Sequence, residues 1–441
     1  MRRYLLLPVA GLLLSAGLLA QNPVIRDQFS ADPTARVFEG KVWLYASHDI
    51  ISPVEPERRW FCMEDYHVFS SEDLVNWTDH GVILDQKDVP WGNPEGYSMW
   101  APECVYRNGK YYFYFPDAPK SGRGFAIGMA SANHPDGPFT PEKNSIQGVF
   151  GIDPTVLVAS DGNAYIYWSG MGFQGARLKD NMTELDGPAV RLDGELPKEG
   201  GLKEGPHVFE REGKFYLTYP WVQDRTEALV YAMSDSPLGP FEYKGKIMEK
   251  SPNECWTNHH SFVEYKGQWY LFYHHNDYSP TFDKNRSVRI DKVRFNPDGT
   301  IEQVTPTLRG VGVTPAKGPV QLDRYSGVCH YGAYLDFLDA SNPWAGWYIL
   351  LSRPATWVRY DEIEFGETAP ASVTFRIRCP EKTRVMLQTG DEKSIGSYGL
   401  PAARDWSEIR LPLETAVTGL QNIKLIVEEG NGLQVDWISF E

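Results

Sequence analysis

Three acidic side chains stand at matching places in a repeating pattern along the chain. Asp32 and Asp153 are each followed by proline, and Glu204 precedes a Gly-Pro pair. Proline keeps the residue before it extended rather than helical. Carboxyl groups gathered in one cavity can cleave a glycosidic bond, because this hydrolysis needs a carboxylic acid and a carboxylate on either side of the bond. Like charges also raise one another's pKa, which helps an acid to stay protonated. Asp32, Asp153 and Glu204 are therefore candidate catalytic residues.

The elements that would position these carboxyls are five similar segments. Each is a polar-glycine turn followed by an alternating aromatic run, which is the pattern of a hairpin leading into a strand. Roughly 50 to 70 residues separate successive turns, whose glycines are Gly40, Gly109, Gly162, Gly213 and Gly267. A second strand–turn pair follows, so each unit has the four strands of a β-propeller blade. The repeat predicts a five-bladed β-propeller; a β-sandwich with accidental likeness is the alternative.

The start of the innermost strand can be located in each unit by counting back about eight or nine residues from the turn glycine. The positions found are Asp32, Ala101, Asp153, Glu204 and His259. All but Ala101 are ionisable, which sandwich packing would not require. Because the innermost strands of a propeller start at a shared axis, we expect these side chains to face one cavity.

In their order along the chain, these motifs resemble glycoside hydrolase family 43 over residues 23 to about 305. The matching segments are Ala31-Asp32-Pro33, Ser98-Met99-Trp100-Ala101-Pro102, Gly151-Ile152-Asp153-Pro154, Lys203-Glu204-Gly205-Pro206 and Asn258-His259-His260-Ser261. The resemblance implies an inverting hydrolase in which Asp32 is the general base and Glu204 the general acid. It also implies that Asp153 orients Glu204 and modulates its pKa.

The same resemblance suggests three further site residues. His259 matches a family histidine beside a calcium ion or a water on the propeller axis, and His260 is the alternative. Calcium prefers oxygen ligands, so a structural Ca²⁺ there would be coordinated largely by water; no organic cofactor is expected. Arg286 matches an arginine that contacts substrate, with a solvated strand arginine as the alternative. Trp100 resembles an aromatic residue of the substrate cleft, with a propeller-core tryptophan as the alternative.

The pattern changes after the fifth unit. Glycine and proline at 311–324 predict a linker between a propeller domain over 21–310 and a second domain over 325–441. Short alternating strands predict that the second domain is a jelly-roll-like β-sandwich. Segments around Trp357, Trp406 and Trp437 resemble carbohydrate-binding module family 6. Ala403 occupies the place of that family's usual stacking tryptophan, so a domain that only packs against the propeller is an equal alternative to sugar binding.

Composition and charge exclude several other partners. The chain has 441 residues and a formal net charge of −15, so nucleic acid and anionic membranes are poor partners. Residues 1–20 combine a basic start with an apolar stretch, which is typical of an export signal. The cysteines are far apart and lack CxxC spacing, so neither a zinc site nor a dense disulfide framework is predicted. We expect an exported monomer, periplasmic or secreted, that acts on carbohydrate.

The predicted activity is hydrolysis that releases a terminal α-L-arabinofuranosyl or β-D-xylosyl residue from plant polysaccharides or oligosaccharides. Family members that act on galactofuranosyl or galactan linkages are an alternative. Retaining fructosidases usually have asparagine before the first carboxylate, where this chain has Ala31. A carbohydrate-binding propeller without catalysis is a further alternative, and the intact Asp32, Asp153 and Glu204 argue against it.

Overall fold

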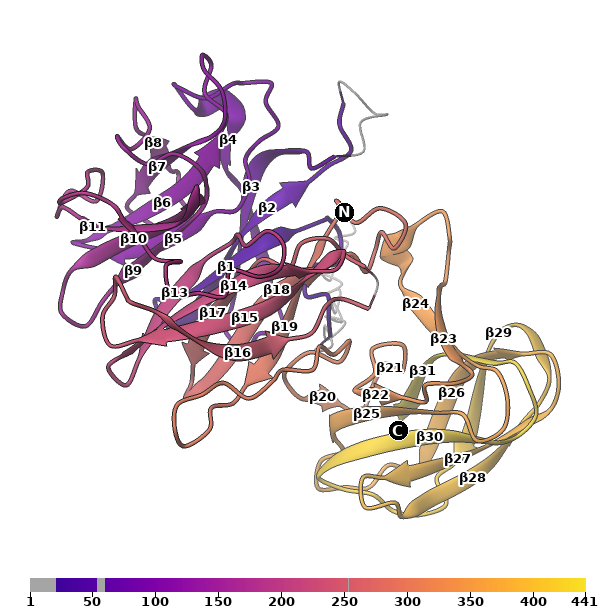
Figure 1. Cartoon of the computed structure of the whole chain (residues 1–441). Coiled ribbons are helices and arrows are strands. Elements are labelled where there is room, and N and C mark those ends of the chain that lie inside the picture. The colour runs from indigo at the N-terminus through magenta and orange to yellow at the C-terminus, as the bar shows by residue number, and fades with distance from the viewer. Residues whose placement is uncertain (1–20, 54–59, 253) are drawn as a thin grey trace, which may run out of the picture.

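The structure, a computed structural model, describes residues 21–53, 60–252 and 254–441; the predicted export signal at 1–20 lies outside the described residues. Strands and two short 3₁₀ helices make up the regular structure of this described part, which contains no α-helix. Figure 1 shows β1 to β19 gathered in one body and β20 to β31 in a second body beside it. Within the described ranges, no helix has the length and apolar character needed to span a membrane.

The first body consists of five antiparallel sheets, each made of strands that are consecutive in sequence. The first sheet contains β1 (Ala31–Phe38), β2 (Lys41–Asp49), β3 (Met63–Ser71) and β4 (Thr78–Asp85), followed by the 3₁₀ helix η1 (Gln86–Asp88). The second contains β5 (Glu103–Arg107), β6 (Lys110–Asp117), β7 (Ala126–Ala132) and β8 (Thr140–Pro141). The third contains β9 (Ile152–Val158), β10 (Ala164–Gly170), β11 (Gly172–Leu178) and β12 (Val190–Arg191). The fourth contains β13 (His207–Arg211), β14 (Lys214–Gln223), β15 (Thr226–Ser234) and β16 (Glu242–Met248). The fifth contains β17 (His260–Tyr265), β18 (Gln268–His275) and β19 (Ser287–Val293).

Tight turns join the first two strands of each sheet at the predicted glycines. In the first hairpin both turn residues have positive φ, 54° at Glu39 and 77° at Gly40. This is the geometry of a type I′ turn, whose twist matches that of the flanking strands. The turn at Asn108 and Gly109 repeats it, with φ of 52° and 79°. The predicted hairpins are confirmed, and each turn sets the position at which the first strand of its sheet begins.

The fifth sheet has three strands, rather than the four predicted for each unit. The N-terminal segment lies along β19 instead. Val24 N donates to Val288 O at 2.9 Å, and Ile290 N donates to the side-chain oxygen of Asn22 at 2.8 Å. The segment leads directly into β1, so it ties the last sheet to the first.

The second body consists of two six-stranded sheets. One contains β20 (Thr314–Pro315), β22 (Gly327–Val328), β25 (Trp357–Glu364), β27 (Thr383–Thr389), β28 (Ser394–Leu400) and β30 (Leu420–Glu429). The other contains β21 (Val320–Gln321), β23 (Ala333–Phe337), β24 (Trp347–Leu351), β26 (Ser372–Cys379), β29 (Ala403–Pro412) and β31 (Leu433–Phe440). The 3₁₀ helix η2 (Pro343–Ala345) precedes β24. Buried residues of both sheets, such as Val358 and Phe375, belong to a single hydrophobic core.

The structure differs from the predicted linker at 311–324. Two short strands lie inside this stretch: β20 pairs with β25, and β21 pairs with β31. The reason is burial, because Val320 and Leu322 are completely enclosed in the core of the second body. The stretch is therefore part of the C-terminal sheets, and strands of two residues are too short to show an alternating pattern.

Non-covalent contacts join the two bodies, and all five cysteines are free thiols. Arg324 Nη1 donates to the carbonyl oxygen of Asn22 at 2.6 Å. The guanidinium of Arg324 also lies over the ring of Trp347, 3.8 Å from its centroid, and Tyr278 stacks on the same ring at 4.8 Å. The second body thus contacts the N-terminal segment that joins the first and fifth sheets.

Candidate active site

Residues from the starts of separate strands line one cavity. Asp32 lies in β1 and Asp153 in β9, whereas Glu204, His259 and Arg286 lie just before β13, β17 and β19. The cavity is lined by Asp32, Trp60, Phe61, Met63, Trp100, Ala101, Ile152, Asp153, Leu202, Glu204, Pro220, Glu227, Trp256, Thr257, His259 and Arg286. All six site residues predicted from the sequence are among them.

The backbone aims two of the carboxylates. Asp32 has φ of 48° and Asp153 has φ of 56°, in the left-handed region that few residues other than glycine adopt and that aspartate tolerates better than most. Beside each residue the register of its strand pair shifts, as in a β-bulge. Bulges are common beside active sites, where they redirect a side chain. Both carboxylates thereby reach the cavity from the edge of a regular strand.

A buried arginine holds Asp32. Arg286 Nη1 and Nη2 donate to Asp32 Oδ1 and Oδ2 at 2.7 and 3.2 Å, a two-pronged geometry that makes such ion pairs strong. Asp32 is 4% exposed and Arg286 is 2% exposed. Burial alone would lower the pKa of Arg286, but Asp32 and Asp49 outweigh it and raise that pKa. Asp32 therefore faces a permanent positive charge.

Asp49, at the end of β2, completes this clamp. Its carboxylate accepts hydrogen bonds from Arg286 N, Nε and Nη2 at 2.8, 2.9 and 2.8 Å. Arg286 Nη1 also donates to Thr257 Oγ1 at 3.2 Å, so all five N–H groups of the guanidinium have partners. The alternative of a solvated strand arginine is wrong. In this structure Arg286 positions Asp32, and none of its side-chain donors is left over for a substrate.

A histidine holds the backbone of Asp32. Asp32 N donates to His274 Nδ1 at 3.0 Å, and His274 Nε2 lies 2.9 Å from Thr257 Oγ1. Burial, reinforced by the charge of Arg286, holds the pKa of His274 well below its usual range. The neutral ring accepts at Nδ1 and donates from Nε2 to Thr257. Asp32 is therefore fixed through both its backbone and its side chain.

Glu204 lies among other acids. Burial raises its pKa and the charge of Asp32 adds to the rise, whereas a hydrogen bond with Glu227 and the charge of Arg286 oppose it. Glu227 is completely buried and accepts the N–H of Asn258 at 2.9 Å. Burial, followed by the neighbouring Glu204, raises the pKa of Glu227 well above its usual range. Glu204 thus keeps a proton to higher pH than an exposed glutamate, as a general acid requires.

Asp153 connects to the backbone next to Glu204. Its Oδ2 accepts the N–H of Gly205 at 2.9 Å, and its Oδ1 lies 4.0 Å from His259 Nδ1. Burial raises the pKa of Asp153 to about 7; His259 opposes the rise, and Glu204 and Asp32 reinforce it. The cavity therefore combines a carboxylate clamped by a cation with carboxyls that resist ionisation. This pairing can supply a base and an acid to one bond.

A comparison with protein families decides between the possible classes. The model of glycosyl hydrolases family 43 matches residues 20–301, a span that contains every cavity residue described above. The chain belongs to glycosyl hydrolases family 43. It is therefore a glycoside hydrolase, as the order of its motifs predicted.

Relatives of this family 43 chain include enzymes that act on pentosides. Xylosidase/arabinosidase 43A from Humicola insolens is 35% identical over 332 residues, which cover 64% of this chain and 99% of that protein. The arabinoxylan arabinofuranohydrolase of Paenibacillus polymyxa is 27% identical, covering 94% of this chain and 73% of that protein. A crystal structure of CoXyl43, a β-xylosidase/α-arabinofuranosidase from a compost microbial metagenome, contains xylotriose in a calcium-free form. It superposes with a TM-score of 0.59 at 34% identity, covering 65% of this chain and 98% of that one.

Aromatic rings form one wall of the family 43 cavity. Trp100 lies 4.5 Å from Phe125 and 6.0 Å from Phe61, measured between ring centroids. The guanidinium carbon of Arg286 in turn lies 4.9 Å from the centroid of the Phe61 ring. Aromatic faces of this kind stack on the apolar faces of sugar rings. Trp100 thus lies at the wall of the cavity and also packs on its neighbours, so both sequence interpretations of this residue describe part of its environment.

The donors around His259 do not by themselves define a calcium site. The nearest carboxylate oxygen belongs to Asp153, whose other oxygen is committed to Gly205. Within the described part of the chain, no group of three metal-ligating side chains includes His259. Calcium takes six to eight oxygen ligands, so only an ion coordinated almost wholly by water would fit. His260 bonds to Thr218 Oγ1 at 2.7 Å and does not line the cavity.

Proposed function

We propose that this family 43 chain is an inverting hydrolase that releases a terminal pentose, α-L-arabinofuranosyl or β-D-xylosyl, from plant polysaccharides or oligosaccharides. The observation that carries the proposal is the clamped carboxylate of Asp32 in the same cavity as the raised-pKa carboxyl of Glu204. The names of the relatives from Humicola insolens and Paenibacillus polymyxa support pentosides as the substrate class.

In the proposed reaction, Asp32 takes a proton from a water molecule as that water attacks the anomeric carbon. Glu204 gives its proton to the departing glycosidic oxygen, so the old C–O bond breaks while the new one forms on the opposite face. Arg286 and His274 hold Asp32 still, which avoids the loss of rate caused by a misplaced reacting group. Asp153 holds the peptide after Glu204 through Gly205 and so orients the acid.

A panel of nitrophenyl glycosides tests the proposed substrate. We expect hydrolysis of the α-L-arabinofuranoside, the β-D-xylopyranoside or both, with little hydrolysis of the β-D-galactofuranoside. Proton NMR of the first product formed should show the inverted anomer. Preference for the galactofuranoside would contradict the substrate class. A retained configuration would contradict the roles of Asp32 and Glu204, and no turnover on any glycan would favour a binding protein.

We also propose an architecture and a location for this enzyme. The five sheets of the first body would be the blades of a five-bladed β-propeller, and the two six-stranded sheets would form a sandwich that resembles carbohydrate-binding module family 6. Residues 1–20 would direct export, and the mature enzyme would act as a monomer. A hydrated Ca²⁺ near His259 would be structural; an unchanged rate after chelation would agree with that role, and loss of activity restored by calcium would contradict it.

A further inference from the structure

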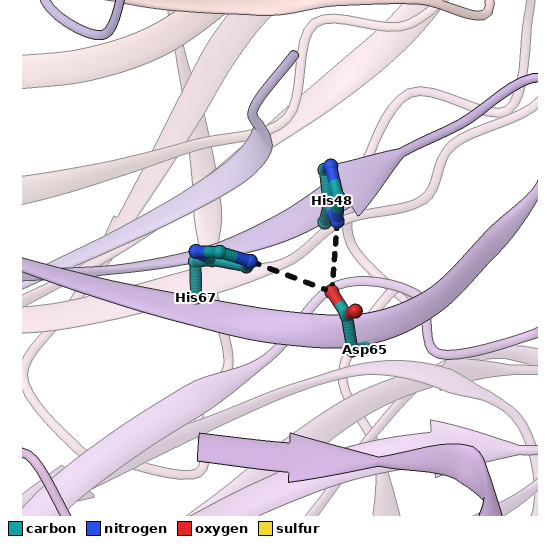
Figure 2. A group of neighbouring side chains, drawn as sticks. All are labelled: His48, Asp65 and His67. Atoms are coloured by element: carbon teal, nitrogen blue, oxygen red, sulfur yellow. Dashed lines mark hydrogen bonds and ion pairs between the residues drawn. The ribbon is translucent and has the colours of Figure 1, made fainter. Parts of the chain in front are cut away.

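Two histidines and an aspartate meet on the first sheet, outside the active-site cavity. His48 lies near the end of β2, and Asp65 and His67 lie two residues apart on β3, which pairs with β2. Residues two apart on a strand point to the same face of the sheet. Figure 2 shows both imidazole rings beside the carboxylate of Asp65. None of the three side chains lines the active-site cavity.

The distances in this cluster suit a small cation. His48 Nδ1 and His67 Nε2 lie 2.9 and 3.9 Å from the same oxygen, Asp65 Oδ1, and the ligand atoms all lie within 4.8 Å of one another. Tetrahedral zinc, with bonds of about 2.0–2.2 Å, needs donor atoms roughly 3.5 Å apart. Small side-chain rotations would therefore be enough to bring the three ligand atoms to the spacing that zinc needs. The side chains of His48, Asp65 and His67 are 23%, 11% and 15% exposed, so an ion can enter from solvent.

A second carboxylate supports the ring of His67 from behind. Asp79 Oδ1 lies 3.3 Å from His67 Nδ1 and accepts the N–H of Gly81 at 2.7 Å. Asp79 Oδ2 accepts a hydrogen bond from Gln28 Nε2 at 3.1 Å. Gln28 Nε2 also lies 3.3 Å from His67 Nδ1. In the tautomer that carries its proton on Nδ1 and donates it to Asp79, the His67 ring presents the lone pair of Nε2 toward Asp65. Carboxylates behind metal-binding histidines act in this way, because they fix the ring and its protonation.

We propose that His48, Asp65 and His67 bind one divalent transition-metal ion, for which zinc is the best match. Two imidazole nitrogens and one carboxylate oxygen form a donor set typical of zinc, whereas calcium prefers oxygen alone. The partial exposure of the cluster leaves room for a water molecule as the fourth ligand. The ion would displace the proton shared by His48 and Asp65 and would join β2 to β3 directly.

The position of the cluster indicates what a bound ion would do. The residue after His48 is Asp49, whose carboxylate accepts Arg286 Nη2 at 2.8 Å in the active site. The ion on His48 and Arg286 on Asp49 would therefore hold two adjacent residues at the end of β2. Bound zinc would thus stabilise the strand that supports the clamp on Asp32, without contact with the substrate.

Calorimetric titration with zinc chloride tests the proposal on the full chain after dialysis against a chelator. The wild type should bind one zinc per chain, and its melting temperature should rise with zinc concentration. His67→Asn should weaken binding at least about tenfold, because a ligand is lost. Asp79→Asn keeps all three ligands but loses the carboxylate behind His67, and it should weaken binding by about 10- to 100-fold. Hydrolysis measured without zinc should equal that of the wild type for both variants, which shows that they are folded.

His134→Asn is the matched control, because His134 is exposed and lies outside the cluster; zinc affinity should not change. Visible absorption of bound Co²⁺ provides a second measurement, and its tetrahedral band should appear in the wild type and be lost in His67→Asn. Absence of zinc binding to the wild type would overturn the proposal. Equal affinity in the wild type and His67→Asn would also overturn it, since the ion would then lie elsewhere, for example near His259.

Discussion

Replacing Asp153 with asparagine should stabilise the protein relative to the wild type, increasingly so as the pH rises. Burial, opposed by His259 and reinforced by Glu204, raises the pKa of Asp153 in the folded chain from 3.8 to about 7. Between these two values the folded chain holds a proton that the unfolded chain has already lost. The contribution of Asp153 to the free energy of unfolding therefore falls as the pH rises from about 4 to about 7, and the loss is complete above that range.

The size of the effect follows from the difference between the two pKa values. About three pH units at about 1.4 kcal/mol each give about 4 kcal/mol in total. Asparagine keeps the shape of Asp153 and an oxygen that can accept the N–H of Gly205, but it has no titrating proton. The free energy of unfolding of Asp153→Asn, minus that of the wild type, should therefore grow by about 1.4 kcal/mol per pH unit between pH 5 and 7.

Urea unfolding at several pH values, followed by tryptophan fluorescence, measures this difference. Asp405→Asn, at an exposed position of β29, is the matched control, and its difference from the wild type should stay constant within about 0.5 kcal/mol. If the stability difference stays flat from pH 5 to 7, the carboxyl of Asp153 is ionised in the folded chain, and the reasoning is refuted.

Three further substitutions and one truncation test other parts of the structure. Asp32→Asn and Glu204→Gln should nearly abolish turnover on natural linkages, but Glu204→Gln should lose much less on an aryl glycoside with a good leaving group; equal losses on both substrates would contradict the acid role. Asp49→Asn should lower the free energy of unfolding by about 3–5 kcal/mol, because it leaves the buried charge of Arg286 partly unpaired. Its turnover should fall by at least about tenfold, because Asp32 is then held less firmly. Urea unfolding measures the first effect and initial rates measure the second. A chain ended at Gly318 should melt at a lower temperature yet still hydrolyse aryl pentosides, whereas calorimetric binding of residues 319–441 to xylan or arabinan would contradict a purely stabilising role for the second body.

Residues at the starts of strands were predictable from the sequence, because the turn glycines mark those positions. Two-residue turns with positive φ at both positions set the length of the hairpins at Gly40 and Gly213, so counting back from these glycines reaches Asp32 and Glu204. Local turn chemistry and alternation operate over about ten residues, within the range that a single sequence displays. The same rule explains why His259 lies with these carboxyls although its sequence neighbours differ from theirs.

Other cavity residues had no such marker. Asp49 ends β2, after a shift in register between Ser47 and Asp49, and Glu227 lies at the start of β15, a third strand of its sheet. Their arrival at the cavity depends on tertiary packing of whole sheets, which no short pattern encodes. His48, Asp65 and His67 were missed for the same reason, because they converge across two strands joined by a long connection. The sequence signal that could have found them is the alternation of Asp65 and His67 on one face.

The pairing of the N-terminal segment with β19 also determines when this fold can be completed. Asn22 bonds to Ile290, 268 residues further along the chain. A ribosome releases Asn22 long before β19 exists, so the first residues must wait for almost the last of the first body. Contacts of such long sequence separation have a large loop-closure cost and slow folding. Because Asp32 and Arg286 lie at opposite ends of the same span, the clamp on the carboxylate of Asp32 forms only when the chain closes on itself.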